Sequence, residues 1–204
     1  MTIAKGRPWG TPGRLPDDGV AVRSDAEARA VVEAARRAGE PVPTLGLLGG
    51  DLCKTLGGLR DEARLRSAEA MTFPVDLGRV TADDRAPGWF VAHAIARGPF
   101  WTGRAVAVMN AQWLGDWDLG PRAHPDDALL DVTDGSLPLG DLAKARRRVR
   151  LGTHLPHPGL RTSRAAHVEL AFDRPRVLWL DGQRVGRVHR LVVDVEPDAL
   201  HVVV

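Results

Sequence analysis

Residues 110–132, NAQWLGDWDLGPRAHPDDALLDV, join two apolar, strand-like stretches and decide how the rest of the chain is interpreted. The segment combines Trp113 and Trp117 with four aspartates that precede its last apolar run. These are Asp116, Asp118, Asp126 and Asp127. A loop of this composition is typically held in one shape to present functional groups. The alternative is a compact connection whose aspartates only cap and turn the backbone.

Short apolar runs flank this segment on both sides and predict strands. Before it they cover residues 71–80, 89–96 and 105–109; after it they cover 129–133, 167–172, 177–180, 188–195 and 200–204. Many short strands separated by turn residues predict a sandwich or a closed sheet. One helical pattern, residues 141–150, interrupts this half.

The front of the chain has a different pattern. Residues 19–23 predict a strand, and Ser24 with Glu27 forms a capping box before an amphipathic helix that ends at Gly39. A second strand follows at residues 44–48. A strand, a helix and a strand in succession predict a parallel βαβ unit. The sequence therefore predicts an α+β protein, with a small α/β lobe in residues 1–58 and a β-sandwich lobe in residues 59–204.

Gly49 and Gly50 lie where the second strand gives way to a short predicted helix. Backbone N–H groups that face outward at such a turn suit a phosphate, so both glycines are candidate cofactor-binding residues. The alternative is that the glycine pair only relieves a steric conflict. Asp51 adds a negative charge that competes with an anion for the same donors.

Composition limits the class of protein. An apolar content of 44% and a charged content of 26% indicate a globular protein, and no apolar run approaches the roughly 18 residues that span a bilayer. The N-terminus lacks the apolar core of a secretory signal, and the single Cys53 cannot form an internal disulfide, so we expect a cytoplasmic protein.

The net charge of +2 and one basic run do not predict a nucleic-acid partner. The run consists of Arg146, Arg147, Arg148 and Arg150. It is typical of a solvated helix face, or of a peripheral contact with anionic lipid headgroups. A homodimer formed through an edge strand is a further expectation.

The β-rich half resembles the C-terminal half of the diacylglycerol kinase and lipid kinase family, which includes the sphingosine kinases. Residues 121–132 (PRAHPDDALLDV) resemble the family's P…DDGLLDV-like loop, residues 177–183 (VLWLDGQ) its strand followed by DGE, and residues 193–204 (VDVEPDALHVVV) its closing strand pair. In the front half, residues 46–58 (GLLGGDLCKTLGG) resemble a shortened form of the family's GxxPxGTxNDxARxLG segment.

The resemblance implies two lobes with an active site between them, where the γ-phosphoryl group of ATP is transferred to a lipid hydroxyl with magnesium. It makes Asp181 the general base. It also implies a metal held by the carboxylate of Asp127 and the backbone carbonyls of His124 and Leu129, an oxygen set that suits magnesium. From the residues alone, Asp181 and Gly182 also fit a simple hairpin turn.

The chain departs from the family pattern at several positions. The GGDGT motif is absent, the GTxND segment is reduced to Gly49-Gly50-Asp51, Ala128 replaces a glycine of the metal loop, and Gln183 replaces the glutamate of DGE. Phosphoryl transfer depends on donors and metal positioned around the phosphates. Two hypotheses follow: a lipid kinase that uses Mg·ATP with a reduced nucleotide lobe, or a pseudoenzyme that binds a lipid or small molecule without catalysis.

Three further features bear on a ligand site. Trp113 and Trp117 are candidates to line a lipid pocket, because large apolar side chains dominate such sites. His154 and His157 lack the one-face spacing of a helical zinc motif, so a metal is not favoured there. His93 lies within an apolar run and is interpreted as a hydrogen-bonded core histidine.

Overall fold

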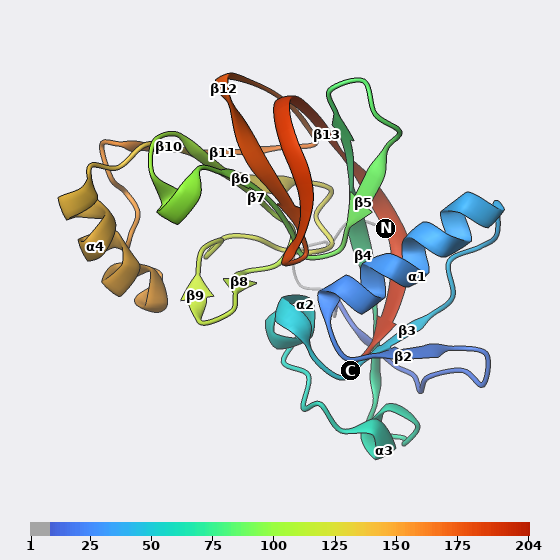
Figure 1. Cartoon of the computed structure of the whole chain (residues 1–204). Coiled ribbons are helices and arrows are strands. Elements are labelled where there is room, and N and C mark those ends of the chain that lie inside the picture. Colours follow the sequence, from blue (N-terminus) through green and yellow to red (C-terminus); the bar gives the residue numbers. More distant parts are fainter. Residues whose placement is uncertain (1–8) are drawn as a thin grey trace.

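The computed structural model describes residues 9–204 and is shown in Figure 1. The predicted βαβ unit is present: β2 (Val20–Val22) and β3 (Leu45–Leu47) pair in parallel and are joined by α1 (Asp25–Ala38). The Ser24 hydroxyl accepts a hydrogen bond from the Glu27 N–H at 3.2 Å. Gly39 ends the helix with φ 70°, a conformation that glycine adopts without strain.

Two short helices follow β3. The first, α2 (Gly50–Thr55), starts at the predicted glycine pair, with Leu52 and Cys53 fully buried. In the charged connector of residues 59–69 only one turn, α3 (Glu62–Leu65), is helical. No longer helix forms there, because Leu65 is the only buried residue of that turn and Leu59 is exposed, so the segment has no continuous apolar face.

The rest of the described chain is dominated by one eleven-stranded sheet. Its main path runs β1-β4-β13-β12-β6-β7-β10-β11, while β5 pairs with β4, and β3 pairs with both β2 and β13. The bounds are β1 (Thr11–Pro12), β4 (Met71–Ala82), β5 (Gly88–Phe90), β6 (His93–Arg97), β7 (Ala105–Met109), β10 (Leu130–Gly135), β11 (Leu160–Ala165), β12 (His167–Leu180) and β13 (Gln183–Val203).

Three strand predictions differ from the structure. The run at residues 89–96 forms two strands, because the strand conformation is interrupted at Val91 and Ala92 between β5 and β6. Conversely, the runs 167–172 and 177–180 form the single strand β12, and 188–195 and 200–204 lie within β13 apart from the last residue. Pairing irregularities mark where these strands bend.

Strand β13 passes through both parts of the molecule. Leu191 and Val193 belong to the core of the β-rich part, and Leu200 and Val202 belong to the core beneath α1. Val202 pairs in parallel with Leu45 of β3. The α+β class is confirmed, and the two predicted lobes share one sheet. The division between residues 58 and 59 stays a prediction.

The Trp-rich segment and the helix after β10 complete the fold. The Trp-rich segment forms a small hairpin of β8 (Trp113–Leu114) and β9 (Trp117–Asp118), which lies near α2 in Figure 1. The 3-10 turn η1 (Pro99–Trp101), α4 (Leu139–Arg148) and η2 (Val149–Leu151) lie close to this hairpin, with η2 in contact with β9. No described helix combines the length and apolar character needed to cross a membrane.

Candidate functional site

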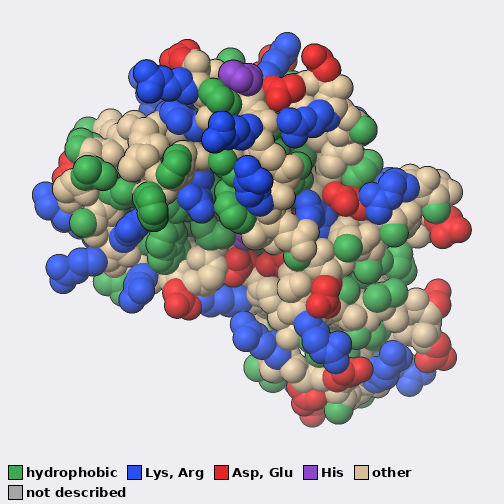
Figure 2. Space-filling model, viewed as in Figure 1, with side chains coloured by type: hydrophobic (Ala, Val, Ile, Leu, Met, Phe, Trp, Pro, Cys, Tyr) green, Lys and Arg blue, Asp and Glu red, His purple; other side chains and the backbone are tan. Residues whose placement is uncertain are grey.

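Four titratable side chains meet where the two parts of the molecule join. Asp25 begins α1, Asp51 lies in α2, His93 begins β6, and Asp181 occupies the turn between β12 and β13. Ligand atoms of Asp25, Asp51 and His93 lie within 4.8 Å of one another. Figure 2 shows acidic side chains at the notch between the two parts. The structure thus places the predicted base Asp181 beside residues that the sequence analysis had not connected with it.

Asp181 is 5% exposed, and its carboxylate accepts hydrogen bonds from backbone N–H groups where strand β5 ends and β6 begins. The N–H of Val91 donates to Oδ2 at 2.9 Å, while those of Ala92 and His93 donate to Oδ1 at 2.9 and 3.1 Å. The residue has φ 48° and precedes Gly182 at φ 78°, so the predicted Asp-Gly hairpin turn is present. Asp181 therefore organises the backbone of this junction, whatever its chemical role.

The position of the Asp25 side chain explains why glycine is needed at the start of α2. Its carboxylate accepts hydrogen bonds from the N–H groups of Asp51 at 2.6 Å and Leu52 at 3.1 Å. Gly50 has φ 94°, and a Cβ there would collide with the Asp25 carboxylate. The glycines thus allow α1 to approach the start of α2. The donors that would bind a phosphate already bind a carboxylate, so this turn does not fit a nucleotide phosphate; a cofactor role for Gly49 and Gly50 stays a prediction.

Three groups at the junction, Asp25, His93 and Asp181, have raised pKa values. Burial, and next the charge of Asp181, raise the pKa of Asp25 to about 6. Burial also raises the pKa of Asp181, against the lowering effects of His93 and of the three N–H donors. Burial disfavours charge on His93, but the hydrogen bond from Nε2 to Asp51 at 3.0 Å and the surrounding carboxylates outweigh it and raise its pKa.

The metal predicted at the Asp-rich loop meets a different arrangement. Oδ1 of Asp127 accepts a hydrogen bond from the Leu129 N–H at 3.1 Å, and Oδ2 contacts the guanidinium of Arg164. Arg164 also donates to Asp131 at 3.2 Å. An internal cation therefore neutralises the carboxylate that the metal would need. A magnesium ion at Asp127 would have to displace this guanidinium, and the metal site predicted at Asp127, His124 and Leu129 stays a prediction.

Asp76 orders that loop and was not found from the sequence. It is 1% exposed; its Oδ2 accepts from the Ala128 N–H at 2.7 Å, and its own N–H donates to the Pro125 carbonyl at 2.7 Å. Ala128 has φ 58°, the position where the family pattern has glycine. Only the position of Asp76 within an alternating strand signalled it, because an aspartate on a buried face requires partners.

An open hollow lies next to the junction, on the side of the β-rich part. It has a volume of about 340 Å³ and is bordered by His93 and by Gly182, the neighbour of Asp181. Its other walls come from β6, η1, the small hairpin and β12. They are Ile95, Arg97, Trp101, Leu114, Trp117 and Trp179. A concave apolar surface with a few polar groups beside perturbed carboxyls is typical of a small-molecule site.

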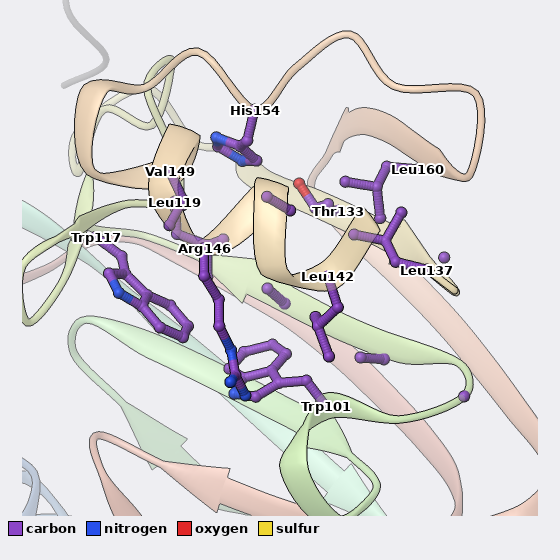
Figure 3. A pocket seen from close by; sticks show the side chains of 15 residues that line it. Trp101, Trp117, Leu119, Thr133, Leu137, Leu142, Arg146, Val149, His154 and Leu160 are labelled. Carbon is purple, nitrogen blue, oxygen red and sulfur yellow. The ribbon is translucent and has the colours of Figure 1, made fainter. Parts of the chain in front are cut away.

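A second, narrower cavity of about 80 Å³ lies beneath α4. Figure 3 shows Trp117 and Leu142 on its wall, with His154 at one end and Arg146 reaching from α4 toward Trp101. Trp101 and Trp117 line both spaces, with ring centroids 5.7 Å apart. Of the two tryptophans that the sequence made candidates for a lipid pocket, Trp117 therefore lines both spaces, whereas Trp113 lies beneath Lys54 Nζ at 3.7 Å. The lipid pocket itself stays a prediction.

His154 is a buried polar group of this cavity. It is 5% exposed, and neither ring nitrogen has a hydrogen-bond partner among the described residues. Burial lowers its pKa, although Asp118 and the nearby Leu119 backbone oppose this. Apart from Arg146, the residues that line the inner cavity carry no fixed charge.

Comparisons with known proteins show which family model and which solved structures this chain resembles. Residues 76–204 match the family model of the YegS C-terminal NAD kinase beta sandwich-like domain. A candidate diacylglycerol kinase from Bacillus anthracis str. Sterne has a similar structure, with a TM-score of 0.67 and 13% identity over 91% of this chain and 77% of that chain. A diacylglycerol kinase from the same organism gives 0.61 and 15%, over 91% and 75%.

No curated protein is significantly similar to the chain in sequence. The structural matches, at this identity, show a shared fold. The matched residues 76–204 make up more than half of the 204 residues and include the larger part of β4, the Asp-rich loop and the strand pair β12 and β13. The chain therefore belongs to the family of the YegS C-terminal NAD kinase beta sandwich-like domain, with the fold seen in diacylglycerol kinases.

Proposed function

We propose that this chain binds a hydroxyl-bearing, lipid-like molecule in the hollow beside Asp181 and does not itself transfer a phosphoryl group. One observation carries the proposal: the carboxylate of Asp25 occupies the N–H donors at the start of α2, where the glycine pair in the sequence predicts a phosphate. A carboxylate and a phosphate compete for the same donors, so the built-in anion excludes the external one.

The charges at the junction support this reading. Asp25, Asp51 and Asp181 are close enough to affect the pKa values of one another or of His93, so the junction repels a triphosphate. The neighbouring cations are engaged with protein groups. Lys54 donates to the Gly115 carbonyl at 2.9 Å, and Arg29 contacts the Gln183 side chain. Phosphoryl transfer requires the opposite arrangement, with cations and donors around the phosphates.

The walls of the hollow support the ligand class. Three tryptophans line it, and the polar junction borders it through His93 and Gly182. An apolar chain can lie against the indole rings while a hydroxyl reaches the polar end. A volume of about 340 Å³ lies within the range of roughly 300–1,000 Å³ that is typical of small-molecule pockets.

Calorimetry and fluorescence test the two halves of the proposal. We expect no saturable heat when the protein is titrated with ATP to millimolar concentration, with or without magnesium. We expect saturable changes in tryptophan fluorescence on titration with single-chain lipid alcohols, because Trp101, Trp117 and Trp179 line the hollow. Saturable, magnesium-dependent ATP binding would contradict the non-catalytic half, and the absence of any fluorescence response would contradict the ligand half.

Phosphoryl transfer is the second candidate function, and one observation favours it. The raised pKa of Asp181 suits a proton acceptor, and its neighbour Gly182 lines the hollow. Incubation with labelled Mg·ATP and lipid alcohols tests this candidate. A labelled product that is lost in Asp181→Asn, at temperatures where that variant remains folded, would establish it in place of the non-catalytic reading.

A further inference from the structure

Arg97 is an unusual wall residue of the open hollow. Its guanidinium carbon lies 5.2 Å from the centroid of the Trp101 ring and 5.3 Å from that of Trp179. Its one hydrogen bond within the described chain goes from Nη1 to the Gly98 carbonyl at 3.2 Å. No carboxylate of the described residues lies within ion-pair distance of it. The two rings fix the position of the cation and leave most of its donors available.

Arg146 brings a second positive charge to the same place from α4. Its Nη2 donates to the Phe100 carbonyl at 3.3 Å, and the described residues provide no ion pair for it either. Burial, and next the charge of Arg146, lower the pKa of Arg97, so the two guanidinium groups are close enough to repel. Keeping two like charges together at the edge of an apolar space is unfavourable without an anion between them.

One apolar cluster continues from these arginines into the protein. Ile95, Ala107, Leu119 and Val149 form its centre, and Trp101, Trp117 and Trp179 pack against it. The cluster therefore lies behind both the open hollow and the narrow cavity beneath α4, which adjoin at Trp101 and Trp117. The inner cavity of about 80 Å³ has room for part of one alkyl chain, and two chains side by side would not fit.

We infer that the ligand is an anionic, single-chain amphiphile, whose carboxylate or phosphate headgroup binds Arg97 and Arg146 while its chain passes the Trp101–Trp117 pair toward the cavity beneath α4. This rests on the proposed ligand-binding function and adds the charge and shape of the ligand. Guanidinium groups bind both kinds of headgroup through paired N–H donors. Figure 2 shows Lys and Arg side chains around apolar surface on this part of the molecule.

Matched ten-carbon probes test the inference, because they differ only in headgroup. Decyl phosphate, decanoate and decanol are titrated separately into the full chain at low ionic strength and pH 7, with tryptophan fluorescence as the readout. We expect the two anions to bind at least tenfold more tightly than decanol. Arg97→Gln should weaken binding of the two anions far more than binding of decanol and so remove most of this preference, since the guanidinium contributes chiefly through the headgroup.

Two further variants and one control keep the test interpretable. Arg146→Gln changes an exposed side chain, so it should fold normally and lower the affinity for the anions several-fold. Arg97→Lys keeps the charge and should retain part of the preference. The matched control is Arg66→Gln, an exposed arginine at the end of α3 without a role in either space, and it should change nothing.

The outcomes separate this inference from the function on which it rests. Equal affinities for decanol and decyl phosphate would overturn the inference and leave the proposed lipid-binding function standing. Failure of all three probes to bind would overturn both. Inorganic phosphate that binds as tightly as decyl phosphate would overturn the inference as well, because the alkyl chain would then add nothing.

Discussion

Arg164 has a role that the loop sequence does not reveal. Its guanidinium contacts Asp127 and Asp131, whose side chains are only 12% and 10% exposed. The loop resembles a metal-binding loop, yet the cation comes from β11, more than 30 residues further along the chain. Two enclosed carboxylates require a nearby positive charge, and here an arginine supplies it.

Replacement of Arg164 by Gln should therefore destabilise the protein and create a dependence on divalent cations. We expect a loss of about 2 kcal/mol in the free energy of unfolding, because the poorly solvated Asp127 loses its cation and Asp131 keeps only the longer contact with Arg122 at 3.8 Å, while Arg164 itself is partly exposed. Millimolar magnesium should restore part of this loss in the variant and leave the original protein unaffected. Urea denaturation with magnesium and with a chelator measures both effects.

Arg161→Gln is the matched control for this prediction, since Arg161 is exposed on the same strand and has no ion pair among the described residues. It should change stability by less than about 0.5 kcal/mol. A chelator that destabilises the unmodified protein would contradict the argument, because it would show that the loop holds a metal despite the arginine.

The residues also show which parts of the candidate site local motifs can point to. The resemblance identified Asp181 and the Asp-rich loop because those motifs are local in the chain. It could not identify Asp25, which in the sequence is only the first residue of a helix, nor Arg164, whose partners lie on a different strand. Contacts between distant segments leave no periodic signal, so the partners of each carboxylate had to come from the structure.

Among the elements, the contact between α1 and α2 depends on one protonatable group. Asp25 belongs to α1, yet its carboxylate satisfies the first N–H groups of α2. Its pKa in the folded protein is raised from 3.8 to about 6, first by burial and then by Asp181. The junction of the two helices should therefore respond to pH in the mildly acidic range.

The sign follows from the direction of the shift. A carboxyl whose pKa is raised by folding binds its proton more tightly in the folded state, so its contribution favours folding at low pH and is lost as the pH rises through about 6. The shift of roughly two pH units corresponds to at most about 3 kcal/mol. Between pH 4.5 and 7.5, the original protein should lose more stability than Asp25→Asn does.

Urea denaturation of both proteins at several pH values measures this difference. Comparison within the pair matters, because His93 and His167 also have raised pKa values and act in the same direction, whereas His124 and His154 have lowered values and act oppositely. Stability curves of the two proteins that run parallel across this range would show that Asp25 does not carry the effect.

The elements that the sequence predicted best are those with a complete local signal. The first helix has a cap, an apolar face and a terminal glycine, and the predicted and observed ends agree closely. Strands β5 and β6 were predicted as one, because the interruption at Val91 and Ala92 serves Asp181, a residue 90 positions away. The sequence analysis predicted β13 as two strands separated by a Pro-containing stretch. In the structure the strand continues through that stretch, with an irregularity in its pairing with β4.

For the whole molecule, the decisive element is β13, because it carries side chains of both main cores. Leu191 packs in the β-rich core, and Leu200 and Val202 pack with Val32 and Leu45 beneath α1. Ten residue pairs join β13 to β4, and β3 pairs with the last residues of β13. The two parts therefore cannot separate without breaking the central strand pair, and we expect them to unfold together.

Val32→Ala tests this coupling from the front of the molecule. Val32 is fully buried in α1, and removing its two methyl groups should cost about 2 kcal/mol. All six tryptophans lie outside residues 19–58, but Trp89 packs against the core beneath α1, whereas Trp101, Trp117 and Trp179 pack around the ligand hollow. Tryptophan fluorescence therefore reports chiefly on the β-rich part, while far-ultraviolet circular dichroism reports on α1 as well. A coupled molecule should show the same shift of the urea midpoint by both methods.

Val185→Ala provides the comparison, because that valine lies on β13 and is 43% exposed, so its loss should shift neither midpoint appreciably. If Val32→Ala lowered the helix signal at urea concentrations where the fluorescence still reported a folded environment, the α1 part would be an independent unit. The shared strand would then be a contact between two domains. Coincident shifts would mean that a change at α1 is felt at the tryptophans of the ligand hollow, through β13 and the sheet.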